Sequence, residues 1–234
     1  MTKQEILDAI HGKMIISCQA IPGEPLYMED DSIMYLMARA AKRAGTPAIR
    51  TSSIRDVVAI KEETGLPVIG LVKIQYPGYD SYITPTMKEV DDLVAVGSDV
   101  VALDCTLRKR GDGTTINEFI AQIKEKYPDI ILMADISNYE EGINAWKCGV
   151  DIVGTTMSGY TDYTSKKDEP DYELMRRLAE DTDIPVIGEG KIHYPDQAVK
   201  ALQTGAWAIV VGGAITRPLE IAERFMKAID EGIK

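Results

Sequence analysis

Two charged side chains follow apolar runs that are otherwise typical of buried strands. Lys73 follows the run VIGLV, and Glu189 follows the run VIG. A charged group is rarely buried without a partner or a chemical role, so these positions indicate a site. A lysine and a glutamate can act as base and acid when burial and neighbouring charges bring their pKa values toward neutrality. A structural ion pair between the two is the alternative.

The last apolar run is followed by residues suited to binding a phosphate group. The segment VVGGAITRP contains Gly212, Gly213, Thr216 and Arg217. Two glycines let the backbone N–H groups approach an anion closely, and an arginine adds a charge-assisted hydrogen bond. Thr216 is expected to cap the helix that follows. The segment predicts a phosphate site at the N-terminus of the final helix.

Elements that position these residues alternate along the whole chain. Eight apolar runs span residues 14–20, 48–52, 68–74, 100–106, 131–137, 151–157, 186–192 and 208–216. Segments with helical spacing follow them at residues 32–45, 53–65, 87–97, 115–128, 138–149, 171–182, 194–205 and 218–233. Eight such pairs predict an α/β fold, a single-domain (β/α)₈ TIM barrel over residues 1–234. A doubly wound open sheet is the alternative, although it would normally use fewer strands in this length.

A short repeat supports this assignment. The strings AKRAGTPAI, AWKCGVDIV and ALQTGAWAI share the pattern A-x-x-x-G followed by β-branched or small residues. Glycine suits the left-handed conformation that ends a helix, and a Val- and Ile-rich run is typical of a strand covered on both faces. Each repeat therefore indicates a helix followed by a buried strand.

The barrel predicts where the polar strand ends meet. Active sites of this fold are built at the carboxyl ends of the strands. Gln19, Arg50 and Asp135 follow or end three of the apolar runs, as Lys73 and Glu189 do. We expect all five side chains at one mouth of the barrel.

Composition excludes several classes of function. The formal net charge is −11, which disfavours nucleic acid and anionic membranes as partners. No segment approaches the roughly 18 apolar residues that span a bilayer. Three scattered cysteines and two histidines show no ligand-like spacing, so we expect a reduced compartment and no metal. A cytoplasmic protein without membrane or nucleic-acid partners is predicted.

Several longer strings resemble a known family. SCQA, EPL, AIR, YITPTMKEVD, ALDCTLRKR, ADIS followed by EEG, TTMSGYT, GEGKI and VVGGAITRP lie between about residues 14 and 226. They resemble the bacterial N-acylglucosamine-6-phosphate 2-epimerases, the N-acetylmannosamine-6-phosphate epimerases of sialic acid catabolism. The resemblance implies interconversion of N-acetylmannosamine 6-phosphate and N-acetylglucosamine 6-phosphate at carbon 2, without an organic cofactor or a metal.

The resemblance also implies roles for individual residues. Lys73 and Glu189 match the catalytic pair, although the sequence does not say which is the acid and which the base. The substrate-binding positions are Gln19, Arg50 and Asp135, and the phosphate-binding positions are Gly190, Gly212, Gly213 and Arg217. The expected partner is a phosphorylated N-acyl amino sugar, and a homodimer is compatible with the family. Two alternatives remain: another phosphosugar isomerase or epimerase, and a non-catalytic phosphosugar-binding protein.

Overall fold

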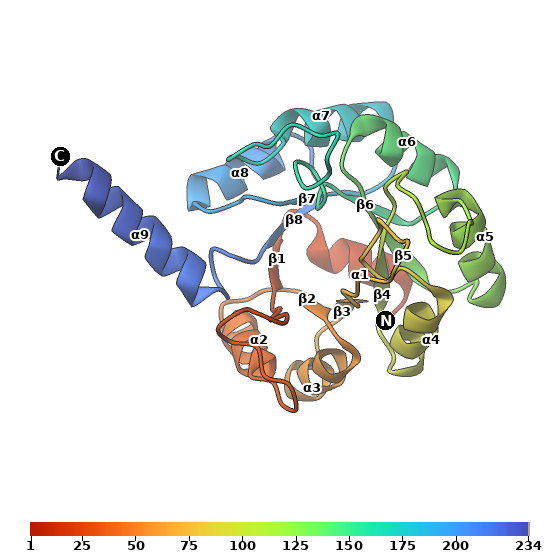
Figure 1. Cartoon of the computed structure of the whole chain (residues 1–234), viewed down its shortest axis with the longest axis horizontal. Helices are drawn as coiled ribbons and strands as arrows, with labels where there is room; N and C mark the ends of the chain where they lie inside the picture. Colours follow the sequence, from red (N-terminus) through yellow and green to blue (C-terminus); the bar gives the residue numbers. More distant parts are fainter. Residues whose placement is uncertain (234) are drawn as a thin grey trace.

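The computed structural model describes residues 1–233, and its centre is a closed ring of eight parallel strands (Figure 1). The strands are β1 (Met14–Ser17), β2 (Ile49–Ser52), β3 (Val68–Leu71), β4 (Val100–Asp104), β5 (Ile131–Asp135), β6 (Ile152–Gly154), β7 (Val186–Glu189) and β8 (Ala208–Val211). The helices are α1 (Lys3–Ile10), α2 (Met34–Arg43), α3 (Ile54–Thr64), α4 (Met87–Ala95), α5 (Ile116–Lys126), α6 (Tyr139–Lys147), α7 (Tyr172–Asp181), α8 (Pro195–Gln203) and α9 (Pro218–Gly232). Each strand pairs with the next, and β1 pairs with β8, which confirms the predicted barrel and rules out the open sheet.

Successive residues of each strand face opposite sides of the barrel wall. In β5, Ile131 and Met133 join the apolar cluster of the barrel interior, whereas Leu132 and Ala134 join the cluster beneath the helices. Side chains alternate in this way along any strand. The inward face therefore continues to Asp135, the last residue of β5.

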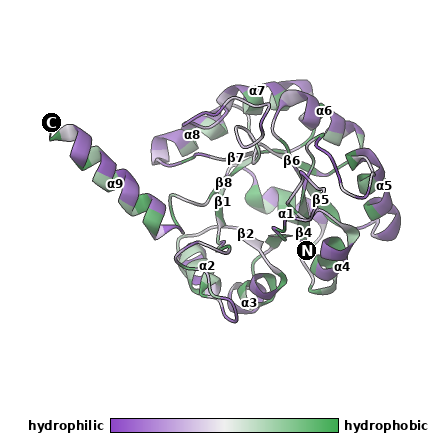
Figure 2. Ribbon diagram, in the orientation of Figure 1, coloured by the Kyte–Doolittle hydropathy of each residue, from purple (hydrophilic) through white to green (hydrophobic). Residues whose placement is uncertain are grey.

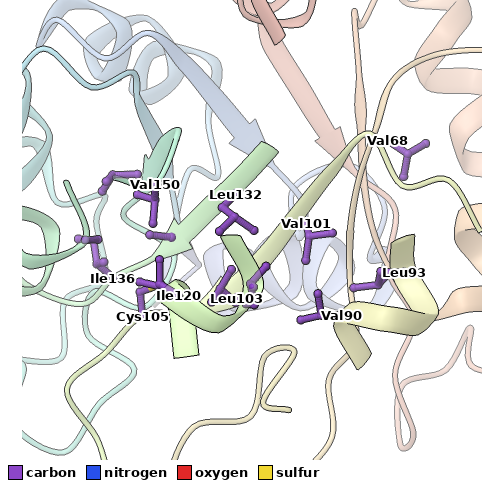
Figure 3. Packing of buried hydrophobic residues seen from close by; sticks show 14 of the residues in the cluster. Val68, Val90, Leu93, Val101, Leu103, Cys105, Ile120, Leu132, Ile136 and Val150 are labelled. Carbon is purple, nitrogen blue, oxygen red and sulfur yellow. The ribbon is translucent and has the colours of Figure 1, made fainter. Parts of the chain in front are cut away.

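The outer cluster packs the strands against the helices that surround them. Figure 3 shows Val101 of β4 beside Val90 and Leu93 of α4, with Leu103 of the same strand near Ile120 of α5. The surrounding helices are amphipathic, with hydrophilic residues on their outer sides (Figure 2). This packing holds the strand ends in fixed positions around the mouth of the barrel.

The N-terminal helix α1 was not expected from the sequence. Its residues Ile6, Leu7 and Ile10 are buried and join the interior cluster. Thr2 and Glu5 form a capping box at its start, and the string TKQE carries the sequence signal for that motif. The helix was missed because no strand precedes it, and it covers the interior of the barrel with apolar side chains.

The final helix α9 differs from the others. It extends away from the barrel, and none of its residues is buried (Figure 1). Its first turn was predicted to be capped by Thr216, and this is wrong. Arg217 occupies the cap position, while the Thr216 hydroxyl donates to the backbone oxygen of Ser17 at 2.6 Å. Thr216 instead ties the start of α9 to β1.

One further feature agrees with the sequence pattern. The glycines that end the repeats, Gly45, Gly149 and Gly205, all have positive φ angles, as expected for helix ends. Nothing in the described residues 1–233 forms a helix both long and apolar enough to traverse a bilayer.

Candidate active site

The period of two along each strand places the predicted residues in the barrel mouth. Lys73 lies two residues after Leu71, and Glu189 lies two residues after Ile187, both of which face the interior. Because β3 and β7 are four places apart in the ring of eight, Lys73 and Glu189 approach from opposite walls. The two proposed catalytic groups are thus positioned by the apolar residues beneath them.

Seven of the nine predicted site residues line one cavity at this mouth: Gln19, Lys73, Glu189, Gly190, Gly212, Gly213 and Arg217. Arg50 and Asp135 do not line it. They lie below Glu189 in the barrel interior, where Arg50 is 1% exposed and Asp135 is fully buried. Arg50 contacts Glu189 directly, and Asp135 is linked to Glu189 through Arg50 and Thr156.

Arg50 is held between two carboxyl groups. Its Nη2 atom lies 2.6 Å from Asp135 Oδ2, and its Nε atom lies 3.3 Å from Glu189 Oε1. The guanidinium also donates to the sulfur of Met133 at 3.3 Å. Gly154 gives Met133 the space it needs, because a Cβ there would lie 2.4 Å from the Met133 methyl group. The cluster is therefore built into the wall of the barrel.

Burial and charge shift the titration of Glu189. Removal of the carboxyl from water raises its pKa, and the neighbouring Asp135 adds to that rise. Arg50 and the hydroxyl of Thr156 act in the opposite direction because they stabilise the carboxylate. Burial outweighs these opposing contacts and raises the pKa of Glu189 overall, which favours its protonated form relative to an ordinary glutamate.

The titration of Lys73 is shifted in the opposite direction. Burial lowers the pKa of its ammonium group, and the positive charges of Arg50 and Arg217 lower it further. Within residues 1–233, no carboxylate lies within 4.0 Å of Lys73 Nζ. Lys73 and Glu189 therefore do not form the structural ion pair that was the alternative, because Glu189 pairs with Arg50 instead.

The end of the cavity nearest α9 is more exposed and carries both signs of charge. Arg217 lies 3.0 Å from Glu24 Oε1 and 3.0 Å from Glu220 Oε1. Glu220 also packs against Gly213, where a Cβ would lie 2.0 Å from its Oε2 atom. A carboxylate thus occupies the space beside the glycine where a phosphate oxygen is expected. An incoming phosphate would compete with Glu220 for Arg217.

Gln19 offers an unsatisfied acceptor in the cavity wall. Its amide nitrogen donates to Ser17 Oγ at 2.9 Å, while its buried Oε1 atom has no partner among the described residues. A buried acceptor without a donor is costly, so a ligand N–H or O–H is a natural partner. This geometry supports the predicted substrate contact.

Sequence reasoning assigned no role to several residues of the site. Thr156 bridges Asp135 and Glu189 with its hydroxyl, at 2.6 Å and 3.0 Å. Its position two residues after Gly154 of β6 is the same signal that identified Lys73 and Glu189. The cavity is also lined by Tyr82, Tyr160, Lys191 and Glu220, whose roles depend on loop paths that no strand pattern encodes. Among residues 1–233 there is no group of three His, Cys, Asp or Glu side chains placed to hold a metal ion.

Comparisons with known proteins agree with one another. The family model described as "Putative N-acetylmannosamine-6-phosphate epimerase" matches residues 34–231. A relative from Caldanaerobacter subterraneus, named "Putative N-acetylmannosamine-6-phosphate 2-epimerase", is 52% identical over 98% of this chain and 96% of its own. A relative of the same name from Clostridioides difficile is 48% identical over 96% of this chain and 99% of its own.

A solved structure is also similar over nearly the whole chain. It is the N-acetylmannosamine-6-phosphate 2-epimerase from Clostridium perfringens, with a TM-score of 0.90 and 46% identity. The match covers 95% of each chain.

Proposed function

The chain belongs to the N-acetylmannosamine-6-phosphate epimerase family, and we propose that it interconverts N-acetylmannosamine 6-phosphate and N-acetylglucosamine 6-phosphate in sialic acid and amino sugar catabolism. The observation that carries the proposal is the approach of Lys73 and Glu189 from opposite walls of one cavity. Inversion at carbon 2 needs one group on each face of the sugar.

The chemistry begins at the ring-opened sugar, where the C2 hydrogen lies next to the C1 aldehyde. A base on one face removes this proton, and an acid on the other face returns one. The lowered pKa of Lys73 favours a neutral amine, which can serve as the base. The raised pKa of Glu189 favours a carboxylic acid, which can serve as the acid. We therefore assign Lys73 as base and Glu189 as acid in one direction, with the roles reversed in the other.

Charge stays balanced through these steps. In the proposed resting state, Arg50 pairs with Asp135, and the assigned roles require Lys73 and Glu189 to be neutral. After proton removal, the Lys73 ammonium offsets the enolate of the substrate. Once Glu189 has given its proton to carbon 2, the ammonium offsets the Glu189 carboxylate instead. No step leaves a net charge in the buried cluster, which keeps the barrier low in a medium of low dielectric constant.

The other predicted residues would bind the remainder of the sugar. Gly190, Gly212, Gly213 and Arg217 surround the end of the cavity nearest α9, which suits the 6-phosphate. Gln19 offers its unpartnered oxygen to a hydroxyl or to the N-acyl N–H group. Arg50 and Asp135 were predicted to contact substrate, and their place below Glu189 favours an indirect role through that side chain.

We also propose that the chain forms a homodimer through α9 and works in the cytoplasm. The exposed fractions of Phe225, Met226 and Ile229 on this helix are 69%, 60% and 50%. An unpartnered apolar helix that leaves its own barrel is suited to packing on a second copy (Figure 2). Light scattering should give a dimer for the parent chain, and Phe225→Asp should yield a monomer. A parent that is monomeric at micromolar concentration would contradict the dimer.

The activity is tested by offering the purified chain N-acetylmannosamine 6-phosphate in deuterium oxide. We expect N-acetylglucosamine 6-phosphate with deuterium at carbon 2, and a much slower reaction with the unphosphorylated sugar. Conversion that retains the original hydrogen would contradict the deprotonation mechanism. Another phosphosugar isomerase would leave this substrate unchanged, and a binding protein would bind it without turnover.

A further inference from the structure

Thr156 lies between two carboxyl groups of the buried cluster. Its Oγ1 atom is 2.6 Å from Asp135 Oδ1 and 3.0 Å from Glu189 Oε2. A threonine hydroxyl has only one hydrogen, so it can donate to one of these groups at a time. If both carboxyl groups were ionised, one of the two short contacts would have no hydrogen between its oxygens. The geometry is satisfied when Glu189 carries a proton and donates it to Thr156, which in turn donates to Asp135.

We propose that Thr156 is a positioning residue whose hydroxyl forms a hydrogen bond with Glu189 in both protonation states of that side chain. It accepts a hydrogen bond from the carboxylic acid and, after that proton has gone to carbon 2, rotates to donate to the carboxylate. The inference rests on the proposed function, because it takes Glu189 as the acid. Only the hydroxyl hydrogen of Thr156 moves, while its heavy atoms remain in place.

The surroundings of Glu189 make this second hydrogen bond valuable. Arg50 from β2 is the cation in contact with its carboxyl group, at 3.3 Å from Oε1. The charge of Asp135 from β5 opposes ionisation of Glu189, whereas the charge of Lys73, which follows β3, favours it. Tyr160 from the loop after β6 also lies near Glu189, and the charge of Glu189 raises the pKa of this tyrosine. When Glu189 ionises, Arg50 is still engaged by Asp135. Thr156 then supplies a donor on the Oε2 side, away from Arg50.

The neighbouring threonine provides a matched control. Thr155 also sits beside Glu189, but its hydroxyl exchanges hydrogen bonds with the backbone of that residue, at 2.9 Å to the oxygen and 3.0 Å from the nitrogen. It makes no hydrogen bond with the carboxyl group of Glu189. A purely structural effect of losing a hydroxyl here should appear in variants of both threonines.

The test compares the pH dependence of kcat for Thr156→Val, Thr156→Ser and Thr155→Val. Valine has nearly the shape of threonine but no hydroxyl. We expect kcat of Thr156→Val to fall about 10- to 100-fold, the effect of one hydrogen bond to a charged group. Loss of the donor should raise the pKa of Glu189, so that the alkaline limb of the profile moves up by about one pH unit. Thr156→Ser should restore both kcat and the limb, and Thr155→Val should leave both limbs in place.

The limb of the pH profile that moves shows whether Glu189 is protonated or ionised before the reaction. If Glu189 were ionised at rest, Thr156 would stabilise the resting and the fully deprotonated forms equally, and the acid limb would move instead. Movement of the acid limb, unmoved limbs, or a serine variant that fails to recover would each overturn the inference. Should Thr156→Val fail to fold, Thr156→Ala gives the same comparison.

An inactive parent chain would overturn the proposed function and this inference with it. An active parent together with an unshifted Thr156→Val profile overturns the role of Thr156 alone.

Discussion

The two ends of the cavity hold charge in different ways. At the interior end, the side chains of Arg50, Asp135 and Glu189 are 1%, 0% and 13% exposed, and Arg50 contacts both carboxyl groups directly. At the α9 end, the side chain of Arg217 is 29% exposed and lies between two carboxylates that are also partly exposed. Buried charges interact strongly and shift one another's titration, whereas exposed ion pairs contribute little and exchange partners readily.

This difference suits two separate functions, one for each end of the cavity. In the proposed mechanism the interior end moves protons, which needs fixed geometry and shifted pKa values. The α9 end needs a cation that can release Glu24 and Glu220 and accept a phosphate instead. Variants at the two ends should therefore fail differently, one in kcat or stability and the other in substrate binding.

The largest effect is expected at the acid–base pair. Lys73→Ala and Glu189→Gln should each lower kcat by roughly 10²–10⁴, the usual contribution of a general acid or base. Glutamine keeps the size of the side chain but cannot donate a proton as a carboxylic acid does. Steady-state kinetics measures this loss. Variants that fold normally and keep kcat within about threefold of the parent would show that the pair is not catalytic.

The next effect concerns stability at the interior end. Arg50→Met removes the cation between Asp135 and Glu189 and leaves buried carboxyl groups without it, so we expect a loss of about 3–5 kcal/mol in the free energy of unfolding. Arg217→Met is the matched change at the α9 end and should cost about 1 kcal/mol or less. Urea denaturation of both variants gives the comparison. Equal losses would mean that the two ends do not differ in the way described.

A smaller effect is expected on binding. Arg217→Ala should weaken binding of the phosphorylated sugar by about 1.5–3 kcal/mol, the contribution of one charged hydrogen-bonding group. The KM should rise much more than kcat falls. The check is to measure the unphosphorylated sugar as well, since its weak binding should be unaffected. If both sugars lose affinity equally, Arg217 does not hold the phosphate.

The smallest effect should come from Glu220. Its carboxylate pairs with Arg217, the proposed phosphate ligand, and lies against Gly213. Glu220→Gln should therefore lower KM by about two- to fivefold, in line with an exposed ion pair. Lys88→Gln, which removes an exposed ion pair of α4 that does not line the cavity, is the control for a general charge effect. A KM that rises in Glu220→Gln would mean that the carboxylate assists binding.

Much of the fold follows from local sequence patterns. Runs such as VVALD and ILMAD alternate with amphipathic segments, and in these strands the period of two carries a polar residue to the mouth. The positions of Lys73 and Glu189 can be predicted for this reason. The same period of two would also have placed Thr156 at the mouth. That residues 1–234 form a single domain stays a prediction, as do the roles of the site residues.

Other features depend on contacts between distant segments. The burial of Arg50 below Glu189 depends on the register of β2 with its neighbours and on the space that Gly154 leaves for Met133. The ion pair of Arg217 with Glu24 joins residues that are far apart in the sequence. The direction taken by α9 is not determined by its amphipathic pattern, which suits packing on either the same barrel or another copy.

The central claim is that one group serves each face of carbon 2, and hydrogen exchange in deuterium oxide tests it most directly. Glu189→Gln retains Lys73, so it should exchange the C2 hydrogen of one epimer without converting it. Lys73→Ala retains Glu189, so it should exchange only the other epimer, at a slow rate. Nuclear magnetic resonance follows both sugars separately. Opposite epimers exchanged by the two variants would agree with this account, and exchange of the same epimer by both would contradict it.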